Sequence, residues 1–232
     1  MVKKAADTEV PPIVEMRNIS IRFPGVLALD KVDFFLRGGE VHALMGENGA
    51  GKSTLIKALT GVYSIDSGTI TVDGVERTFD ATADAQEAGI STVYQEVNLC
   101  DNLSVGENVM LGHEPRGAKG IDWARLHEQA AHFLKGLGLD LDTRSQLATH
   151  SIAIQQLVAI ARAMVIDSRV LILDEPTSSL DSDEVERLFQ VIRDVKAKGV
   201  AVLFVSHFLD QVYEIADRIT VLRNGQLVGE YP

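Results

Sequence analysis

One stretch decides the fold of this chain: Gly46-Glu47-Asn48-Gly49-Ala50-Gly51-Lys52-Ser53-Thr54, which fits the pattern G-x-x-x-x-G-K-[ST]. An apolar run over residues 42–45 predicts a strand before it, and a helix is predicted from Lys52 onward. Glycines let the backbone turn its N–H groups inward and approach an anion closely. The helix start adds the positive end of its dipole. The stretch therefore predicts a phosphate-binding loop; a glycine-rich turn without a ligand is the alternative.

The same pattern gives individual residues a role. Lys52 is predicted to reach the β- and γ-phosphates of a nucleotide, and the Ser53 hydroxyl to ligate Mg²⁺. The remaining positions of the stretch 46–54 are predicted to surround the phosphates.

The composition limits the class of partner. The chain has 232 residues, enough for one large domain or two small ones, and a net charge of −11. Because no broad positive field is available to follow a phosphodiester backbone, nucleic acid is disfavoured as a partner. A single cysteine, Cys100, permits no internal disulfide, which fits a reducing compartment. No apolar run is long enough to cross a bilayer, and residues 1–12 form a loose polar leader.

Strand and turn signals dominate the first third. A strand is predicted over residues 13–21. The turn at residues 37–39 predicts a hairpin between residues 34–36 and 42–45. Asp73-Gly74 predicts a hairpin between residues 69–72 and 75–79, and Asn224-Gly225 predicts another near the carboxyl end.

Helices and buried strands alternate in the rest of the chain. Helices are predicted after Asp122, over residues 154–166, and before Gly199. The wholly apolar runs 170–173 and 200–205 are typical of strands buried on both faces of a parallel sheet. The expected class is α/β, with ligands at the carboxyl ends of the buried strands.

Two carboxylates follow one of these strands. Asp174 can hold Mg²⁺ directly or through water, and Glu175 can orient and deprotonate the water that attacks the γ-phosphorus. Alone, such a pair is more often a solvated loop or a helix cap. With the phosphate loop upstream, a hydrolytic site is favoured.

The run Leu173-Asp174-Glu175-Pro176-Thr177-Ser178-Ser179-Leu180-Asp181, together with the phosphate loop, resembles an ABC-type ATPase domain. The resemblance covers nearly all of the chain after Pro12. It implies a P-loop NTPase fold of ABC type, with a mixed central sheet, an antiparallel β subdomain and a helical subdomain. The implied division is a core over 13–95 and 166–232, with a helical subdomain over 96–165.

The resemblance also implies roles for scattered residues. Phe23 would stack on adenine, although a core phenylalanine is an equal alternative from composition alone. Gln95 would link Mg²⁺ and water to the surface that faces a transporter, and His207 would contact the γ-phosphate. The loop Ser179-Leu180-Asp181 would cross to a second ATPase subunit.

One motif departs from the family pattern. Where the family has Leu-Ser-Gly-Gly-Gln, this chain has His150-Ser151-Ile152-Ala153-Ile154, followed by Gln155. In this family two domains pack head to tail, and the signature of each contacts the nucleotide of the other. Ile152 adds bulk where a glycine is expected, so we expect a weak signature here and an asymmetric pair of sites. The sequence does not explain His150.

The phrases around Phe23, around Gln95 and at Glu107-Asn108 resemble the first ATPase domain of bacterial monosaccharide importers. Within that group, the runs of residues 151–156 and 206–213 are most similar to the galactofuranose importer. The resemblance implies ATP and Mg²⁺ as cofactors, a second ATPase half downstream, membrane permease subunits and, indirectly, a periplasmic sugar-binding protein. It places the chain at the cytoplasmic face of the inner membrane. A soluble ABC-type ATPase acting on nucleic acid or the ribosome, and a nucleotide-binding assembly module, are the alternatives.

Overall fold

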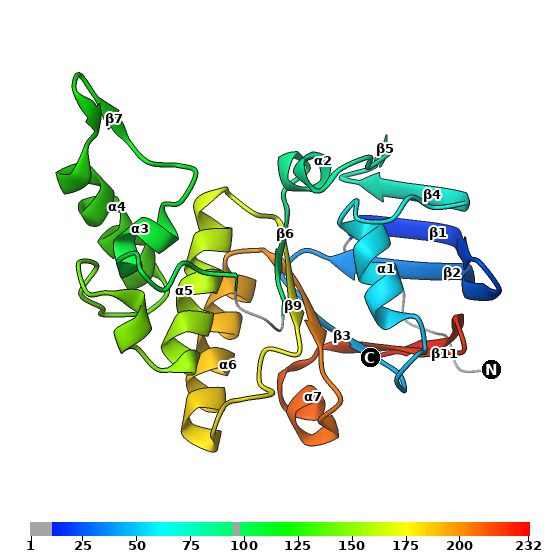
Figure 1. Ribbon diagram of the computed structural model, residues 1–232. Coiled ribbons are helices and arrows are strands. Elements are labelled where there is room, and N and C mark those ends of the chain that lie inside the picture. Colours follow the sequence, from blue (N-terminus) through cyan, green and yellow to red (C-terminus); the bar gives the residue numbers. More distant parts are fainter. Residues whose placement is uncertain (1–10, 95–97) are drawn as a thin grey trace.

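The computed structural model describes residues 11–94 and 98–232 (Figure 1). Its strands are β1 (Pro12–Phe23), β2 (Val26–Arg37), β3 (Val41–Met45), β4 (Ser67–Val72), β5 (Val75–Arg77), β6 (Ile90–Val93), β7 (Arg116–Gly117), β8 (Gly120–Ile121), β9 (Val170–Asp174), β10 (Ala201–Val205), β11 (Arg218–Arg223) and β12 (Gln226–Tyr231). Its helices are α1 (Lys52–Leu59), α2 (Thr82–Glu87), α3 (Val105–Val109), α4 (Trp123–Gly136), α5 (Ile152–Val165), α6 (Ser182–Ala197) and α7 (Leu209–Ile215), with a 3₁₀ turn over Leu147–Thr149.

The central sheet has six strands in the order β12-β11-β3-β10-β9-β6. All are parallel except β12, which pairs antiparallel with β11. The residues of β10 are all buried, as expected for strands covered on both faces. Neighbouring residues of β9 serve opposite cores: Leu171 belongs to one and Ile172 to the other. This alternation explains why the run carries no polar residue before Asp174.

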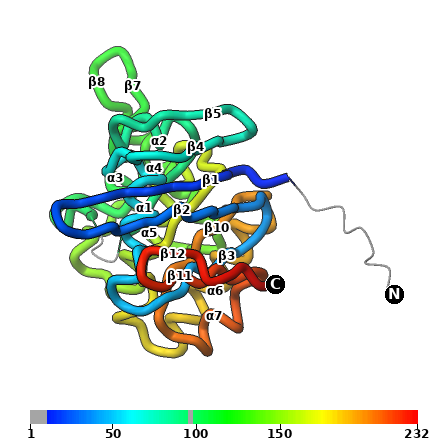
Figure 2. Tube along the Cα trace, turned by 90° about the vertical axis from the view of Figure 1, so that its right-hand side faces the viewer, coloured from blue at the N-terminus to red at the C-terminus, as the bar shows by residue number. Residues whose placement is uncertain are grey.

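A second, antiparallel sheet has the order β2-β1-β4-β5. Helix α1 lies between this sheet and one face of the central sheet, and its Leu55, Ile56 and Leu59 are buried in the core that the two sheets share (Figure 1). In the turned view β1 and β2 run side by side, with β2 between β1 and the β11–β12 hairpin (Figure 2). The ion pair from Arg37 to Glu230, 3.1 Å long, joins β2 to β12.

The other face of the central sheet is covered by α5 and α6, and α3 and α4 pack beyond α5 (Figure 1). Phe189 of α6 and Phe204 of β10 meet nearly perpendicular, with ring centroids 6.0 Å apart. Helices α4 and α6 each present one apolar stripe to this core, as helical periodicity predicts, whereas α5 is buried all round over residues 156–161. Ala50 of the phosphate loop belongs to the core that the two sheets share, whereas Leu173 of β9 and Phe204 of β10 belong to this one.

The predicted hairpin across residues 37–39 is wrong. β2 and β3 lie in different sheets, because β3 pairs in parallel with β10 and β11. The two glycines instead lie where the chain passes from one sheet to the other. The Gly39 N–H donates to the carbonyl of Gly199 at 3.0 Å, and a Cβ on Gly38 would lie 3.1 Å from that carbonyl oxygen. A turn of this composition is compatible with both paths, so local sequence did not distinguish them.

The two other hairpins are confirmed, with Val72 opposite Val75 and Arg223 opposite Gln226. The strand predicted to end at residue 79 ends at Arg77. The helix predicted from residue 154 begins at Ile152.

The leader predicted over residues 1–12 is wrong at its end, because Pro12 belongs to β1 and lies opposite Arg37. Residues 1–10 lie outside the described part of the chain. Within the described ranges the longest helix is α6, with 16 residues, and none combines the length and hydropathy needed to cross a membrane.

Candidate functional site

The phosphate loop joins β3 to α1 through backbone conformations that favour glycine. Gly46 has φ +152° and Gly51 has φ +105°. A Cβ on Gly46 would lie 2.5 Å from the Leu222 carbonyl oxygen, and one on Gly51 would lie 2.8 Å from Leu29 Cδ2. Any other residue at either position would have an unfavourable φ and a Cβ too close to its neighbours. A Cβ on Gly49, in contrast, would meet no heavy atom within 4 Å.

A hollow of about 380 Å³ opens beside this loop. Besides Asn48 to Thr54, it is lined by the start of β2 and by Asn224 and Gly225 of the β11–β12 turn. The Gly225 N–H donates to the Ala50 carbonyl at 3.0 Å, and its own carbonyl accepts from the Asp30 N–H at 2.8 Å. Gly225 thus links the loop to β2, although both segments are distant from it in sequence.

Helix α1 begins directly after Gly51, which gives it no side-chain cap. The first N–H groups of an uncapped helix are donors for an anion, reinforced by the helix dipole. The Lys52 ammonium bends back over the loop and donates to the carbonyls of Gly46 at 2.7 Å and Glu47 at 3.3 Å. Positive charge and oriented N–H groups therefore converge on the loop, with Ser53 exposed beside them.

Asp174 ends β9 and is half-buried. Burial raises the pKa of its carboxyl, and the charge of Glu175 raises it further, while Lys52 and Lys57 oppose the shift. The structure thus brings two carboxylates into the electrostatic reach of the phosphate loop. Oxygen ligands of this kind, with a serine hydroxyl, are the donors that Mg²⁺ prefers.

Glu175 and His207 meet at the ends of neighbouring strands. Asp174 lies opposite Val205 in the parallel pair β9–β10, so the residues that follow leave the sheet at the same edge. His207 Nδ1 lies 2.9 Å from Glu175 Oε2. Glu175 is held by its N–H, which donates to the Val205 carbonyl at 2.9 Å, and has a left-handed φ of +50°. A strained non-glycine backbone at such a point is typical of functional sites.

The loop after Glu175 leads into α6. Thr177 donates from its hydroxyl to Gln211 Oε1 at 2.6 Å, which joins this loop to α7. Asp181 caps α6 and forms a reciprocal capping box with Glu184. Of the predicted crossing loop, Ser179 is exposed, Leu180 half-buried and Asp181 committed to its helix.

Phe23 lies at the end of β1 and is half-buried. Its ring meets that of Tyr63 at 71°, with centroids 5.1 Å apart. It lines a hollow of about 720 Å³ that shares Leu27 with the hollow at the phosphate loop. The predicted adenine stacking remains a prediction.

The altered signature lies at the start of α5. Ser151 caps the helix, with its hydroxyl accepting from the Ile154 N–H at 3.4 Å, and Ala153 is buried. The side chain of Ile152 is 57% exposed. The Gln155 side chain donates to the His150 carbonyl at 3.1 Å, and His150 Nε2 lies 2.7 Å from Ser145 Oγ. His150 thus ties the preceding loop to the start of α5.

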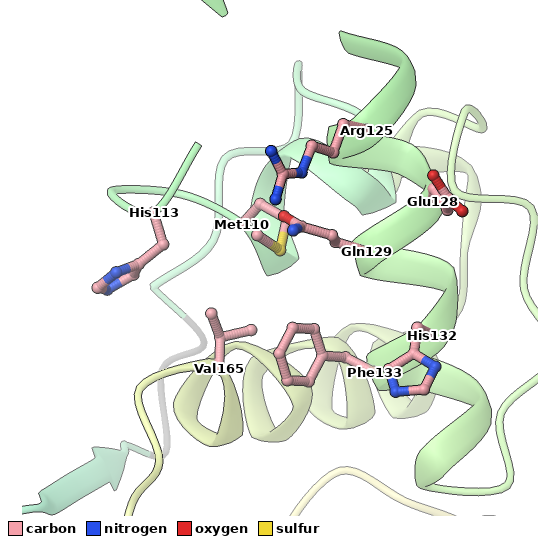
Figure 3. A pocket seen from close by; sticks show the side chains of 8 residues that line it. All are labelled: Met110, His113, Arg125, Glu128, Gln129, His132, Phe133 and Val165. Carbon is pink, nitrogen blue, oxygen red and sulfur yellow. The ribbon is translucent and has the colours of Figure 1, made fainter. Parts of the chain in front are cut away.

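Gln95 lies outside the described residues, and the structure resumes at Asn98. Arg162 of α5 donates to the Asn98 carbonyl at 2.9 Å, and also lines a hollow of about 340 Å³ beside β6. His113 lines both this hollow and a second one of about 620 Å³ on α4. The second hollow contains the aromatic ring of Phe133 next to Val165 (Figure 3).

Three contributors to the site were not predicted as site residues. Asn224 and Gly225 carried only a hairpin signal, and Phe208 stood only within a run that resembles the galactofuranose importer. The ring centroid of Phe208 lies 4.0 Å from that of His207. The only signal in the sequence that could have indicated a role for Phe208 is its position directly after His207, a predicted site residue.

Comparison with known proteins gives a consistent result. The sequence pattern of the ABC transporter family matches residues 29–178. The fructose import ATP-binding protein FruK of Bifidobacterium longum is 66% identical over 224 residues, which cover 96% of this chain and 44% of that protein. The galactofuranose transporter ATP-binding protein YtfR of Escherichia coli is 54% identical over 217 residues, covering 94% and 43%. The chain spans less than half the length of these relatives.

Solved structures show the same fold. A nucleotide-free ATP-binding cassette from an ABC transporter superposes with a TM-score of 0.83 at 27% identity, covering 94% of this chain and 90% of that one. A dimeric bacterial ABC transporter cassette gives a TM-score of 0.79 at 26% identity, covering 94% and 97%. The predicted fold class, a P-loop fold of ABC type with a mixed sheet and helical parts, is confirmed.

Proposed function

This chain belongs to the ABC transporter family, and from that premise we propose that it is an ATP-binding and ATP-hydrolysing domain that energises the import of a monosaccharide. The contact of 2.9 Å between Glu175 and His207, beside the phosphate loop, carries the proposal. A carboxylate and an imidazole at that edge supply a base and a hydrogen-bond donor for phosphoryl transfer to water. Nucleotide binding alone would not require them.

The residues divide the chemistry between them. Lys52 and the N–H groups of the loop bind the phosphates, and Glu175 takes a proton from the attacking water. His207 donates to an oxygen of the γ-phosphate, where negative charge develops. Ser53 and Asp174 would hold Mg²⁺, which neutralises phosphate charge. Burial and the charge of Glu175 raise the pKa of Asp174, and a divalent cation bound there would oppose this shift by favouring the ionised form.

The partner in this proposal is a second ATPase half of the same polypeptide, packed head to tail. The greater length of the relatives supports it. The loop of residues 179–181 crosses to that half. The start of α5 offers it a weak signature, since Ser151 caps the helix and Ile152 occupies the place of a glycine. The phosphate loop of this chain therefore forms the stronger of two unequal sites.

The membrane permease subunits contact the hollow on α4 and the one beside β6. Phe133 and Val165 give the larger hollow an apolar part, and Arg125 and Gln129 line it with polar atoms (Figure 3). Such a mixture suits a short amphipathic segment of a permease. The domain thus lies peripherally at the cytoplasmic face of the inner membrane, and a periplasmic sugar-binding protein supplies the sugar.

The relatives' names support a proposal for the class of the transported sugar. Galactofuranose is the expectation from sequence phrases, whereas the fructose import relative has the higher identity, 66% against 54%. Both sugars are monosaccharides that adopt a five-membered ring, so we propose a sugar in its furanose form. Uptake of labelled fructose and galactofuranose by cells carrying the whole transporter separates the two.

Glu175→Gln in the full-length protein, assembled with its permease, tests the hydrolytic role. We expect ATP affinity within about threefold and hydrolysis lower by about 100-fold or more, since a general base is worth 10²–10⁴. Glu186→Gln is the matched control, because Glu186 pairs with Arg193 on the exposed face of α6. Undiminished turnover in Glu175→Gln would refute the assignment.

A further inference from the structure

We propose that Phe208 is a positioning residue for His207. The ring centroids of the two side chains lie 4.0 Å apart and their planes are tilted by 38°, so the two rings are in direct contact. Phe208 is 40% exposed, so burial in a core does not account for the ring at this place. The proposal rests on the role of His207 in the proposed function.

The imidazole needs such support because little else confines it. The side chain of His207 is 60% exposed, and its hydrogen bond to Glu175 Oε2 fixes only the Nδ1 atom. Rotation about this contact would still move the rest of the ring. A second contact, on the ring face, restricts that rotation.

Phe208 is itself well anchored. Its N–H donates to the hydroxyl of Ser206, a buried residue, at 3.1 Å. Its carbonyl accepts from the Val212 N–H at 3.1 Å, at the start of α7. The Thr177–Gln211 hydrogen bond holds the same helix against the loop after Glu175. The aromatic ring therefore extends from a backbone that is fixed relative to Glu175.

The two contacts together select one orientation of the imidazole. Nδ1 is engaged by Glu175, so Nε2 is the ring nitrogen that can meet a γ-phosphate oxygen. Holding this orientation before ATP arrives lowers the reorganisation needed in the transition state. Loss of Phe208 is thus expected to reduce kcat more than it weakens ATP binding.

Phe208→Leu in the full-length transporter tests the kinetic consequence. A stacked pair contributes enough to predict a kcat about three- to tenfold lower, with the KM for ATP within about twofold. Phe208→Tyr keeps the ring and should restore kcat to within about twofold. Tyr213→Leu is the control, because Tyr213 is a 72% exposed aromatic residue on α7, the helix that starts directly after Phe208, and it should not change kcat. Equal kcat in Phe208→Leu and the parent protein would overturn the proposal.

A spectroscopic measurement separates stacking from general damage. In full-length protein labelled with ¹³C in histidine rings, the His207 ring protons are assigned with His207→Gln. Removal of the stacked ring in Phe208→Leu should move them downfield, whereas Tyr213→Leu should leave them unchanged. Unmoved resonances in Phe208→Leu would overturn the inference, whatever the outcome for the proposed function. Full turnover in His207→Gln would refute the proposed role of His207 while leaving the stacking measurable.

Discussion

The amino termini of α1 and α5 differ in whether a side chain satisfies their first N–H groups. Gly51 gives α1 no side-chain cap and leaves these donors facing a hollow of about 380 Å³. Ser151 caps α5 with its own hydroxyl, and Ile152 projects next to it, 57% exposed. A helix start therefore suits an anion when the chain does not satisfy the donors itself. We infer from this difference that the two ends contribute unequally to nucleotide binding.

Lys52→Ala and Ile152→Gly test most directly whether the starts of α1 and α5 contribute unequally to nucleotide binding. Loss of the ammonium at the phosphates should lower ATP hydrolysis and transport by about 100-fold or more. A glycine at Ile152 should leave transport within about twofold and cost at most about 1 kcal/mol of stability. Sugar uptake by cells carrying each variant measures both. Equal losses of transport would contradict the inferred inequality.

Gly51→Ala and Gly49→Ala test how an added Cβ near the uncapped start of α1 affects ATP affinity. Both glycines have positive φ, so alanine costs about 1–2 kcal/mol at either position. The new Cβ at position 51 would also lie 2.8 Å from Leu29 Cδ2, whereas the one at position 49 would have open space. ATP affinity should fall about tenfold or more in Gly51→Ala and by less in Gly49→Ala. Equal affinities in titrations of the two variants would show that this close approach is irrelevant.

Asp174→Asn gives the smallest effect, on stability. Folding raises the pKa of this carboxyl, so the folded chain binds the proton more tightly than the unfolded chain. The resulting stabilisation is fully present below pH 3.8, the ordinary pKa of an aspartic acid, and is lost as pH rises through the raised pKa of the folded state. At pH 7, without nucleotide or Mg²⁺, Asp174→Asn should be more stable by about 1 kcal/mol or less, because the half-exposed group is screened by solvent.

Thermal unfolding at pH 7 and at pH 3 measures this difference. The gain in Tm should be present at pH 7 and vanish at pH 3, where both residues are neutral. A lower Tm for Asp174→Asn at pH 7 would contradict the electrostatic explanation.

The elements with strong local signals were predictable. The phosphate loop has a fixed spacing of residues, and the runs 170–173 and 200–205 are too apolar for any strand but a buried one. The path after Arg37 was not predictable, because a Gly-Gly turn permits both a hairpin and a crossing between sheets. The difference between them depends on Gly199, which is distant in sequence.

The candidate site shows the same division. Asp174 and His207 carry recognisable signals at the ends of two buried strands, and the pairing of β9 with β10 explains why their edges coincide. The stacking of Phe208 depends on side-chain directions at the start of α7, which no local pattern encodes. Ser151 carried a family signal, but its use as a helix cap depends on where α5 begins.

The position of β3 in the central sheet has a consequence for biosynthesis. β3 pairs with β10 and β11, which both follow it by more than 150 residues. Gly225, whose N–H donates to Ala50, is equally distant in sequence. At about 5–20 residues per second, roughly ten to thirty seconds pass between translation of the phosphate loop and of Gly225. The candidate nucleotide site is therefore encoded early and completed late, so nascent chains released before the β11–β12 hairpin lack the hydrogen bond from Gly225 to Ala50.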